Sequence, residues 1–400
     1  MSLFIFALIL AAPAFADDGD LVSIELLDTT STGKIDVVEI TVEYAVETAA
    51  EVHFPTSEAA AIAAFTVTDN TTSEEVTIDS ITFESGDGAV AVFRLVLDES
   101  DANLSYDTSA DALDVDYDGS GEELAIRDGS SDNPVSVASF SGVTNDDGAG
   151  PAIVSARTLS TTTFEIVFSE EVDFSTIADG NLEFENTETT GYESIAVADL
   201  DPASDSDTYV VTVTDEFAVD EATATVRFSG AGVIEDLVGN NNTQTAEVTI
   251  ADGIAPTVTG LSVDLALVTL SNNEIEVEVT FSEAMDDTVV PVITFSAGGA
   301  WDATGPGNWS VGDTVYTRSF EAPVGLEADD VNVTVNAAAD AAGNVMSEHI
   351  EPDQFDIDTL APTVLSATTG DVDGNGRIDR IIVVYSEPVV DAGYNAVAVS

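Results

Sequence analysis

The chain has 400 residues, no Cys, and 76 Asp and Glu against 8 Lys and Arg, for a formal net charge of −68. Such a charge excludes nucleic acid as a natural partner and disfavours anionic membranes, and the lack of Cys excludes disulfides and thiolate metal sites. Because 44% of the residues are apolar, we interpret the acids as a solvated coat on about three or four folded domains, suited to a salty or cation-rich setting.

Residues 1–16 predict a secretory signal peptide. An apolar run is followed by Ala14-Phe15-Ala16, an A-x-A cleavage pattern, and the mature chain would begin at Asp17. A typical signal also carries a Lys or Arg before the apolar run, and this one does not. The run is too short to cross a bilayer, and no later segment approaches the required length. We therefore expect a secreted protein with no membrane span in these residues.

The remaining sequence predicts an all-β fold. A strand with alternating apolar residues that ends in an acidic turn occurs four times, with aromatic anchors at Tyr44, Phe168, Phe281 and Tyr385. The anchors are roughly 100–125 residues apart, which is the size of one β-sandwich domain. Further strand-like segments are separated by turn clusters at intervals of roughly 8–15 residues, and helical periodicity is nearly absent.

Acidic linkers that contain proline set the domain boundaries. They begin at Asp147, Asp252 and Asp358, and each leads through a proline into an apolar strand, where proline costs no ladder hydrogen bond. The fourth domain has less than half of the repeat length, so we expect it to be truncated. The boundaries are a signal peptide and four β-domains, at residues 1–16, 17–146, 147–251, 252–357 and 358–400.

Three short motifs give the repeats a family likeness. In the third domain they are the opening Ala255–Val258, the segment Phe281–Asp286 and the closing Asp340–Asn344. This pattern resembles the bacterial and archaeal Ig-like repeats of surface-layer proteins and large adhesins. The second domain matches nearly as well and the fourth as far as it goes, whereas the first departs at Ala45-Val46-Glu47 and has no clear D-x-x-G-N. The resemblance implies tandem immunoglobulin-like β-sandwiches, arranged like beads on a string at the cell exterior, and it carries no catalytic residues.

One acidic loop predicts a Ca²⁺ site. Calcium prefers six to eight oxygen ligands, which a loop can supply from alternate positions. Residue 382, at the twelfth position, is Ile instead of the bidentate Glu of an EF-hand, and strand-like flanks replace its helices. The alternative is an Asx-rich hairpin turn without metal. The predicted ligands are Asp371, Asp373, Asn375, the carbonyl of Arg377, and Asp379.

A second acidic run follows the same alternating scheme but also lacks the last bidentate acid. In a chain this acidic such runs arise by chance, so a site without metal stays open. Residues 28–36 align with residues 371–379, but Thr30 and Thr32 replace two strong ligands, so we expect a plain turn there. The candidate ligands of the second run are Asp114, Asp116, Asp118, Ser120 and Glu122.

The linkers suggest a third type of site. Asp147, Asp252 and Asp358 open the linkers, and acidic turns such as 170–171 or 286–287 could approach them. Calcium held between such groups would stiffen the joint, and the alternative is a short solvated linker.

Other chemistry is sparse. His53 and His349 lie in different domains without a catalytic motif, so no catalytic residue is predicted. Trp301 and Trp309 could form a platform for sugars, but burial at the edge of a β-domain is favoured. Arginines within predicted strands are expected to pair with carboxylates across the sheet; they are Arg94, Arg227 and Arg318. Possible glycan acceptors are Asn70, Asn103, Asn241, Asn308 and Asn332.

Together these features predict a structural protein of the cell surface and not an enzyme. The leading hypothesis is a component of an S-layer or similar lattice that self-associates with the help of divalent cations, because copies carrying a charge of −68 repel one another. The runner-up is an adhesin stalk that binds carbohydrate or protein ligands. A third hypothesis is the accessory region of an extracellular hydrolase whose catalytic domain lies elsewhere.

Overall fold

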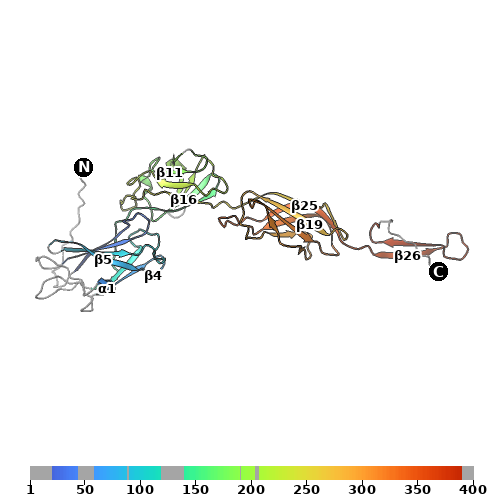
Figure 1. The fold of residues 1–400 in the computed structure, drawn as a ribbon, viewed down its shortest axis with the longest axis horizontal. Coiled ribbons are helices and arrows are strands. Elements are labelled where there is room, and N and C mark those ends of the chain that lie inside the picture. The colour runs from blue at the N-terminus through green and yellow to red at the C-terminus, as the bar shows by residue number, and fades with distance from the viewer. Residues whose placement is uncertain are drawn as a thin grey trace. The chain divides into compact units, whose positions relative to one another are not determined.

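A computed structural model describes residues 20–43, 58–87, 90–118, 139–189, 191–202 and 207–389. Within them the protein is nearly all β, with strands β1 to β27, the short helix α1 (Glu58–Ile62) and two 3-10 turns (Figure 1). No helix among the described residues is long and apolar enough to cross a membrane. The chain divides into two compact units, residues 1–253 and 254–400, which are described separately.

The first β-domain contains two sheets that share one hydrophobic cluster. On β2, Val38, Ile40 and Val42 are fully buried while the residues between them face outward, as expected from the period of two of a half-buried strand. The five-stranded sheet has the order β5 (Ile78–Asp87), β6 (Val90–Leu97), β2 (Val37–Glu43), β1 (Asp20–Leu27) and β8 (Asp146–Asp147). The second sheet is β4 (Glu74–Glu75), β3 (Phe65–Asp69) and β7 (Leu113–Tyr117).

The second β-domain is one path of eight strands that closes over its own core. Phe164 on β10 packs on Phe184 of β11, with ring centroids 5.9 Å apart, although four steps of pairing separate these strands. The path is therefore folded back on itself around one cluster of buried residues. Its order is β12 (Glu193–Ser194), β11 (Leu182–Glu185), β15 (Thr225–Phe228), β16 (Val248–Ala251), β9 (Ile153–Ser160), β10 (Thr163–Phe168), β14 (Thr208–Thr212) and β13 (Leu200–Pro202).

The third β-domain again has two sheets around one cluster. Trp301 packs on Phe295 with ring centroids 4.1 Å apart, and Trp309 lies 4.9 Å from Tyr316, so both tryptophans contact the core, as the burial interpretation expects. One sheet is β17 (Val258–Val263), β19 (Glu274–Phe281), β23 (Val315–Glu321) and β21 (Asp302–Ala303), with β22 (Asn308–Trp309) also on β23. The other is β18 (Leu267–Thr269), β25 (His349–Asp358), β24 (Glu327–Asn336) and β20 (Val292–Phe295).

The same closure recurs in all three β-domains. A strand near the end of each pairs in parallel with one near its start: β8 with β1, β16 with β9, and β25 with β18. The last segment begins as the repeats do, since β26 (Val364–Gly370) pairs with β27 (Arg380–Tyr385) through Val364 and Tyr385, just as Val258 pairs with Phe281. The parallel closing pair and the opening antiparallel pair therefore recur along the chain, although the sheets of the three β-domains differ in strand number and order.

Two of the three strand arginines, Arg94 and Arg227, confirm the expected cross-strand pairing with carboxylates. Glu39 stands directly opposite Arg94, and Glu183 opposite Arg227, with oxygen–nitrogen distances of 2.8 and 2.9 Å. Arg318 differs, because its register partner is the apolar Val277.

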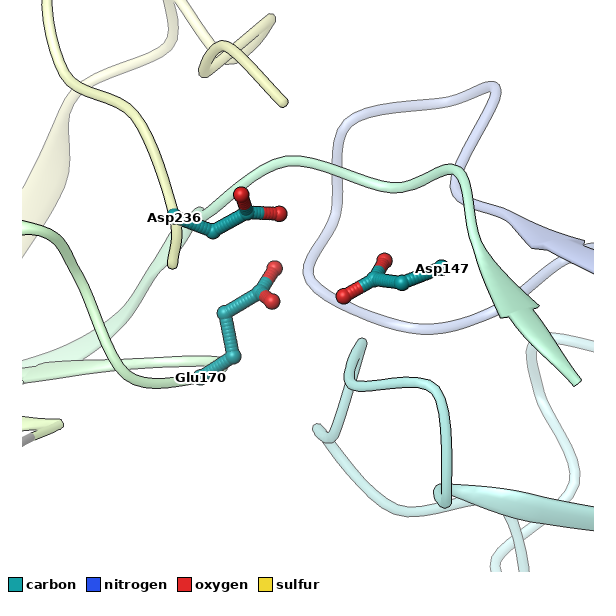
Figure 2. Close-up of side chains that lie close together, drawn as sticks. All are labelled: Asp147, Glu170 and Asp236. Carbon is teal, nitrogen blue, oxygen red and sulfur yellow. The ribbon is translucent and has the colours of Figure 1, made fainter. Parts of the chain in front are cut away.

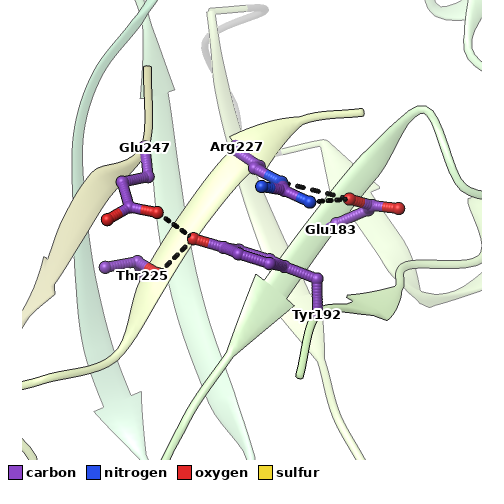
Figure 3. Close-up of polar contacts among 5 residues, drawn as sticks. All are labelled: Glu183, Tyr192, Thr225, Arg227 and Glu247. Carbon is purple, nitrogen blue, oxygen red and sulfur yellow. Dashed lines mark hydrogen bonds and ion pairs between the residues drawn. The ribbon is translucent and has the colours of Figure 1, made fainter. Parts of the chain in front are cut away.

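Around Arg227 the ion pair is part of a larger surface contact. The ring of Tyr192 lies 3.5 Å from the guanidinium carbon, and its hydroxyl contacts Thr225 and Glu247 (Figure 3). Tyr192 therefore packs on Arg227 of β15 and also contacts the residue that precedes β16.

Gly307 is a point where packing tolerates no side chain. A Cβ at this residue would lie 1.8 Å from the Tyr316 hydroxyl oxygen and 2.1 Å from its ring carbon, and Tyr316 is itself buried. We expect Gly307→Ala to lower the free energy of unfolding of the second unit by about 1–3 kcal/mol, since the ring must shift within a packed core. The check is urea unfolding against Gly260→Ala, whose Cβ meets its nearest neighbour at 3.7 Å. Equal stability of the two variants would contradict this account of the packing.

Candidate metal centres

Three acidic side chains meet inside the first unit, where the first two β-domains join. Asp147, Glu170 and Asp236 each offer a carboxylate oxygen, and these oxygens lie within 4.8 Å of one another. Figure 2 shows the three side chains pointing into a common space. Glu170 and Asp236 are only 7% and 2% exposed, and Asp147 is half-buried. We call these three residues the joint cluster.

The turn that carries Asp236 wraps around its carboxylate. The backbone N–H groups of Val238, Gly239 and Asn240 donate to Asp236 Oδ1 at 2.6–2.8 Å. Gly239 has a φ of +98°, which a residue with a side chain rarely adopts, so the turn requires glycine there. Asn240 Nδ2 donates both to Asp236 Oδ2 at 2.8 Å and to the carbonyl of Asp147 at 3.1 Å. The D-x-x-G-N turn thus fastens the second β-domain to the linker.

Glu170 is held by a residue of the first β-domain. The hydroxyl of Thr108 donates to Glu170 Oε1 at 2.5 Å and also contacts the hydroxyl of Ser169 at 2.8 Å. Ser169 in turn accepts the backbone N–H of Ala152 at 3.0 Å. The three residues of the joint cluster come from the linker and the second β-domain, and Thr108 connects them to the first β-domain.

Burial dominates the electrostatics of the joint cluster, and charge repulsion adds to it. Burial raises the pKa of Glu170 to about 8, and the Asp147 and Asp236 carboxylates act in the same direction. Burial also raises the pKa of Asp147 to about 7, with Asp236 as the next cause. No Lys or Arg among the described residues forms an ion pair with these acids. A hard divalent cation such as Ca²⁺, which binds carboxylate oxygens, would relieve this repulsion.

The sequence located this joint in part. Asp147 with the 170–171 turn was predicted, and the structure brings Asp147 and Glu170 together, while Glu171 is exposed. Asp236 was missed as a site residue, because D-x-x-G-N was interpreted only as a turn. The sequence signal that could have identified Asp236 is the repetition of D-x-x-G-N before the last strand of two domains.

The second unit repeats the buried acids and the D-x-x-G-N turn. Glu283 and Asp340 occupy the corresponding places in the repeat and are 4% and 1% exposed. Asn344 donates to Asp340 through its backbone N–H at 2.8 Å and its Nδ2 at 2.9 Å, as Asn240 does to Asp236. The buried acid and the turn around it are therefore properties of the repeat.

The predicted calcium loop is an exposed hairpin turn between β26 and β27. Oxygens of Asp371, Asp373 and Asp379 lie within 4.8 Å of one another, so the structure brings together three of the predicted ligands. Asn375 Nδ2 donates to Asp373 at 2.7 Å, and the N–H of Arg377 donates to Asn375 Oδ1 at 2.9 Å. Backbone hydrogen bonds, above all from Gly376, lower the pKa of Asp371.

Loop 28–36 has the same turn geometry as loop 371–379 but fewer acidic side chains. Gly33 donates to Asp28 Oδ2 at 2.7 Å, just as Gly376 donates to Asp371 Oδ2 at 2.7 Å. The φ angles of the two glycines are +82° and +81°. The sequence alignment of the loops is confirmed, and the turn forms without the full set of predicted ligands.

The second acidic run begins as a strand and not as a loop. Asp114 and Asp116 lie on the exposed face of β7, while Leu113, Val115 and Tyr117 alternate with them into the core. Asp118 follows the strand and is exposed, and Ser120 and Glu122 lie outside the described residues. Their role in metal binding stays a prediction.

The predicted glycan acceptors differ in accessibility. Asn70, Asn241 and Asn308 are exposed, whereas Asn103 and Asn332 are half-buried. Asn70 Nδ2 and Asn103 Nδ2 already donate to backbone carbonyls, at 2.7 and 3.0 Å. Glycosylation at any of them stays a prediction.

The chain matches no protein-family model and no curated relative. Among solved structures, it is similar to the N-terminal part of the bacterial S-layer protein SbsC, at 17% identity and a TM-score of 0.23, covering 52% of this chain and 44% of that one. The S-layer protein rSbsC(31-844) matches at 12% identity and a TM-score of 0.20, over 92% of this chain and 63% of that one. A marsupial T cell receptor matches at 9% identity and a TM-score of 0.17, over 84% and 99%. The chain thus spans less than two thirds of these SbsC structures, and TM-scores this low support no functional conclusion.

The raised pKa values of the joint cluster predict a pH dependence in metal-free buffer. Between about pH 4.5 and 8 folded Glu170 keeps a proton that the unfolded chain releases, so the free energy of unfolding falls as pH rises. One pKa unit corresponds to about 1.4 kcal/mol, so we expect a loss of a few kcal/mol across this range. Urea unfolding of the first unit in EDTA at pH 5 and pH 8.5 measures it.

Glu170→Gln removes the titrating group and should flatten this pH profile. At pH 8.5 in EDTA we expect this variant to be more stable than the wild type by about 1–3 kcal/mol, because a buried charge is lost. Glu171→Gln is the matched control, since it removes the same charge from an exposed neighbour. A Glu170→Gln profile as steep as that of the wild type would contradict the assignment.

Proposed function

We propose that the protein is a secreted structural component of a cell-surface layer, built from tandem Ig-like β-sandwiches whose joints are stiffened by Ca²⁺. The observation that carries this proposal is the joint cluster, where buried carboxylates from the linker and the second β-domain meet a hydroxyl group of the first. In this role the number of β-domains sets the length of the protein, and a cation at the joint limits how far neighbouring domains bend. No catalytic step is part of this role.

Several features support an exterior and structural role. The apolar leader at residues 1–16, which lies outside the described residues, predicts export. The net charge of −68 gives each copy a field that repels other copies and concentrates small cations. The three described arginine–carboxylate pairs lie across strands and so stabilise individual sheets. Neutralisation between domains and between copies is therefore left to cations from the solvent.

Calcium at the joint cluster should reverse the stability order of the variants. Binding to the folded state alone adds about 2.7 kcal/mol when free Ca²⁺ is 100 times the dissociation constant. In EDTA at pH 8.5 we expect Glu170→Gln to be the more stable protein, and in saturating Ca²⁺ the wild type. Urea unfolding in both buffers, with Glu171→Gln as control, measures the crossing. The same order in both buffers would rule out Ca²⁺ at this joint.

Assembly should depend on divalent cations. At low salt we expect the protein to form sheets or ordered clusters in Ca²⁺ and to remain dispersed in EDTA, because screening and bridging both weaken without the ion. Negative-stain microscopy of the same preparation in the two buffers is the measurement. Ordered sheets in EDTA would contradict the role of cations, and monomers in Ca²⁺ would favour the alternative, an adhesin stalk that binds carbohydrate or protein ligands.

A further inference from the structure

A hollow of about 330 Å³ lies on the first β-domain, apart from the joint cluster. Its walls include the turn after β3, the residues around the start of β7 and the segment that leads into β8. Three of its lining residues carry side-chain oxygens of particular interest: Asp111, Asp114 and Asn145. No Lys or Arg lines it. Its charge therefore favours a cation.

The buried amide of Asn145 lacks a partner on one side. Asn145 is 5% exposed, and its Nδ2 donates to the carbonyls of Leu113 at 2.5 Å and Ala110 at 3.3 Å. Both partners can only accept, so the nitrogen must face them and the oxygen must face away. That oxygen, Oδ1, is enclosed and has no hydrogen-bond partner. An unpaired buried acceptor is costly, so a ligand that satisfies it is expected.

Two acidic residues, Asp111 and Asp114, line the same hollow as Asn145. Asp114 is on the exposed face of β7, opposite Thr68 in the ladder, and Asp111 lies in the preceding turn. Asn70 donates from Nδ2 to the Asp111 carbonyl at 2.7 Å and from its backbone N–H to the carbonyl of Ala112, which anchors this turn. The acids thus stand on supported backbone in the wall of the hollow that Asn145 also lines.

We propose that this hollow binds a partly hydrated divalent cation, with the carboxylates of Asp111 and Asp114 and Asn145 Oδ1 as its protein oxygens. Carboxylate and amide oxygens are ligands that Ca²⁺ accepts, and it tolerates water in the remaining positions. A water takes up roughly 30 Å³ in the liquid, so a hollow of this size holds an ion together with several waters. A water molecule alone would also satisfy Asn145 Oδ1, whereas the two exposed carboxylates add attraction for a cation.

Crystals of the full chain soaked in Mn²⁺ test the proposal, because the anomalous signal shows where the ion binds. We expect a peak in the hollow, bound to the three oxygens directly or through water. The peak should vanish in Asp114→Asn and persist in Asp116→Asn, which removes the same charge from the same strand face but does not line this hollow. An empty hollow, a lone water at Asn145, or a peak unchanged in Asp114→Asn would overturn the proposal.

Solution measurements separate this site from the others. Calorimetric titration with Ca²⁺ should show one equivalent fewer, or one site weakened at least about tenfold, in Asp114→Asn and in Asp111→Asn. Both residues are exposed, so the variants should fold, and circular dichroism verifies this. Glu170→Gln should instead remove the equivalent at the joint cluster, so the two sites can fail independently. Wild-type stoichiometry and affinity in both hollow variants would overturn the proposal.

Discussion

Repulsion between buried carboxylates is the interaction on which the joint of the first unit depends. Glu170 and Asp236 are removed from water beside Asp147, and burial raises the pKa of Glu170 and of Asp147. No Lys or Arg in the described ranges forms an ion pair with these acids, and Arg94, Arg157 and Arg227 are engaged across strands. Protons or cations from the solvent would therefore stabilise the joint. Its stability is tied to the composition of that solvent.

The fold makes this arrangement easy to repeat. Each β-domain closes by pairing a late strand with an early one, which brings the end of the domain back to its beginning. The acidic turn after β10 and the D-x-x-G-N turn are then neighbours, as the bridge between Val172 and Asp236 shows. The corresponding bridge in the next repeat joins Met285 and Asp340. In the second and third β-domains the same arrangement thus generates a buried acidic pair.

Periodicity predicted the all-β fold and the cross-strand pairing of Arg94 and Arg227, because these depend on neighbours in the sequence or in one ladder. Burial depends on distant segments, and that is why Asp236 was interpreted as a turn residue only. The run from Asp114 fits two patterns, a D-x-D loop and a strand with alternating apolar residues. The structure has the strand, because burying Leu113, Val115 and Tyr117 in the core stabilises the fold more than an exposed D-x-D loop would.

The paired loops indicate where dependence on metal should reside. Loop 28–36 lacks two acidic ligands of loop 371–379, yet the same Gly-to-Asp hydrogen bond closes both at 2.7 Å. The backbone N–H groups already satisfy these acids, so the turns need no ion to form. The joint cluster differs, because Glu170 and Asp236 are buried and burial raises the pKa of Asp147 and of Glu170, whereas the acids of loop 371–379 are exposed. A turn whose acids are already hydrogen-bonded gains little stability from a cation. A joint whose buried carboxylates repel one another would gain stability when a cation binds. Under the proposed role of calcium, we therefore expect its effect on stability at the joint and not at the hairpin loops.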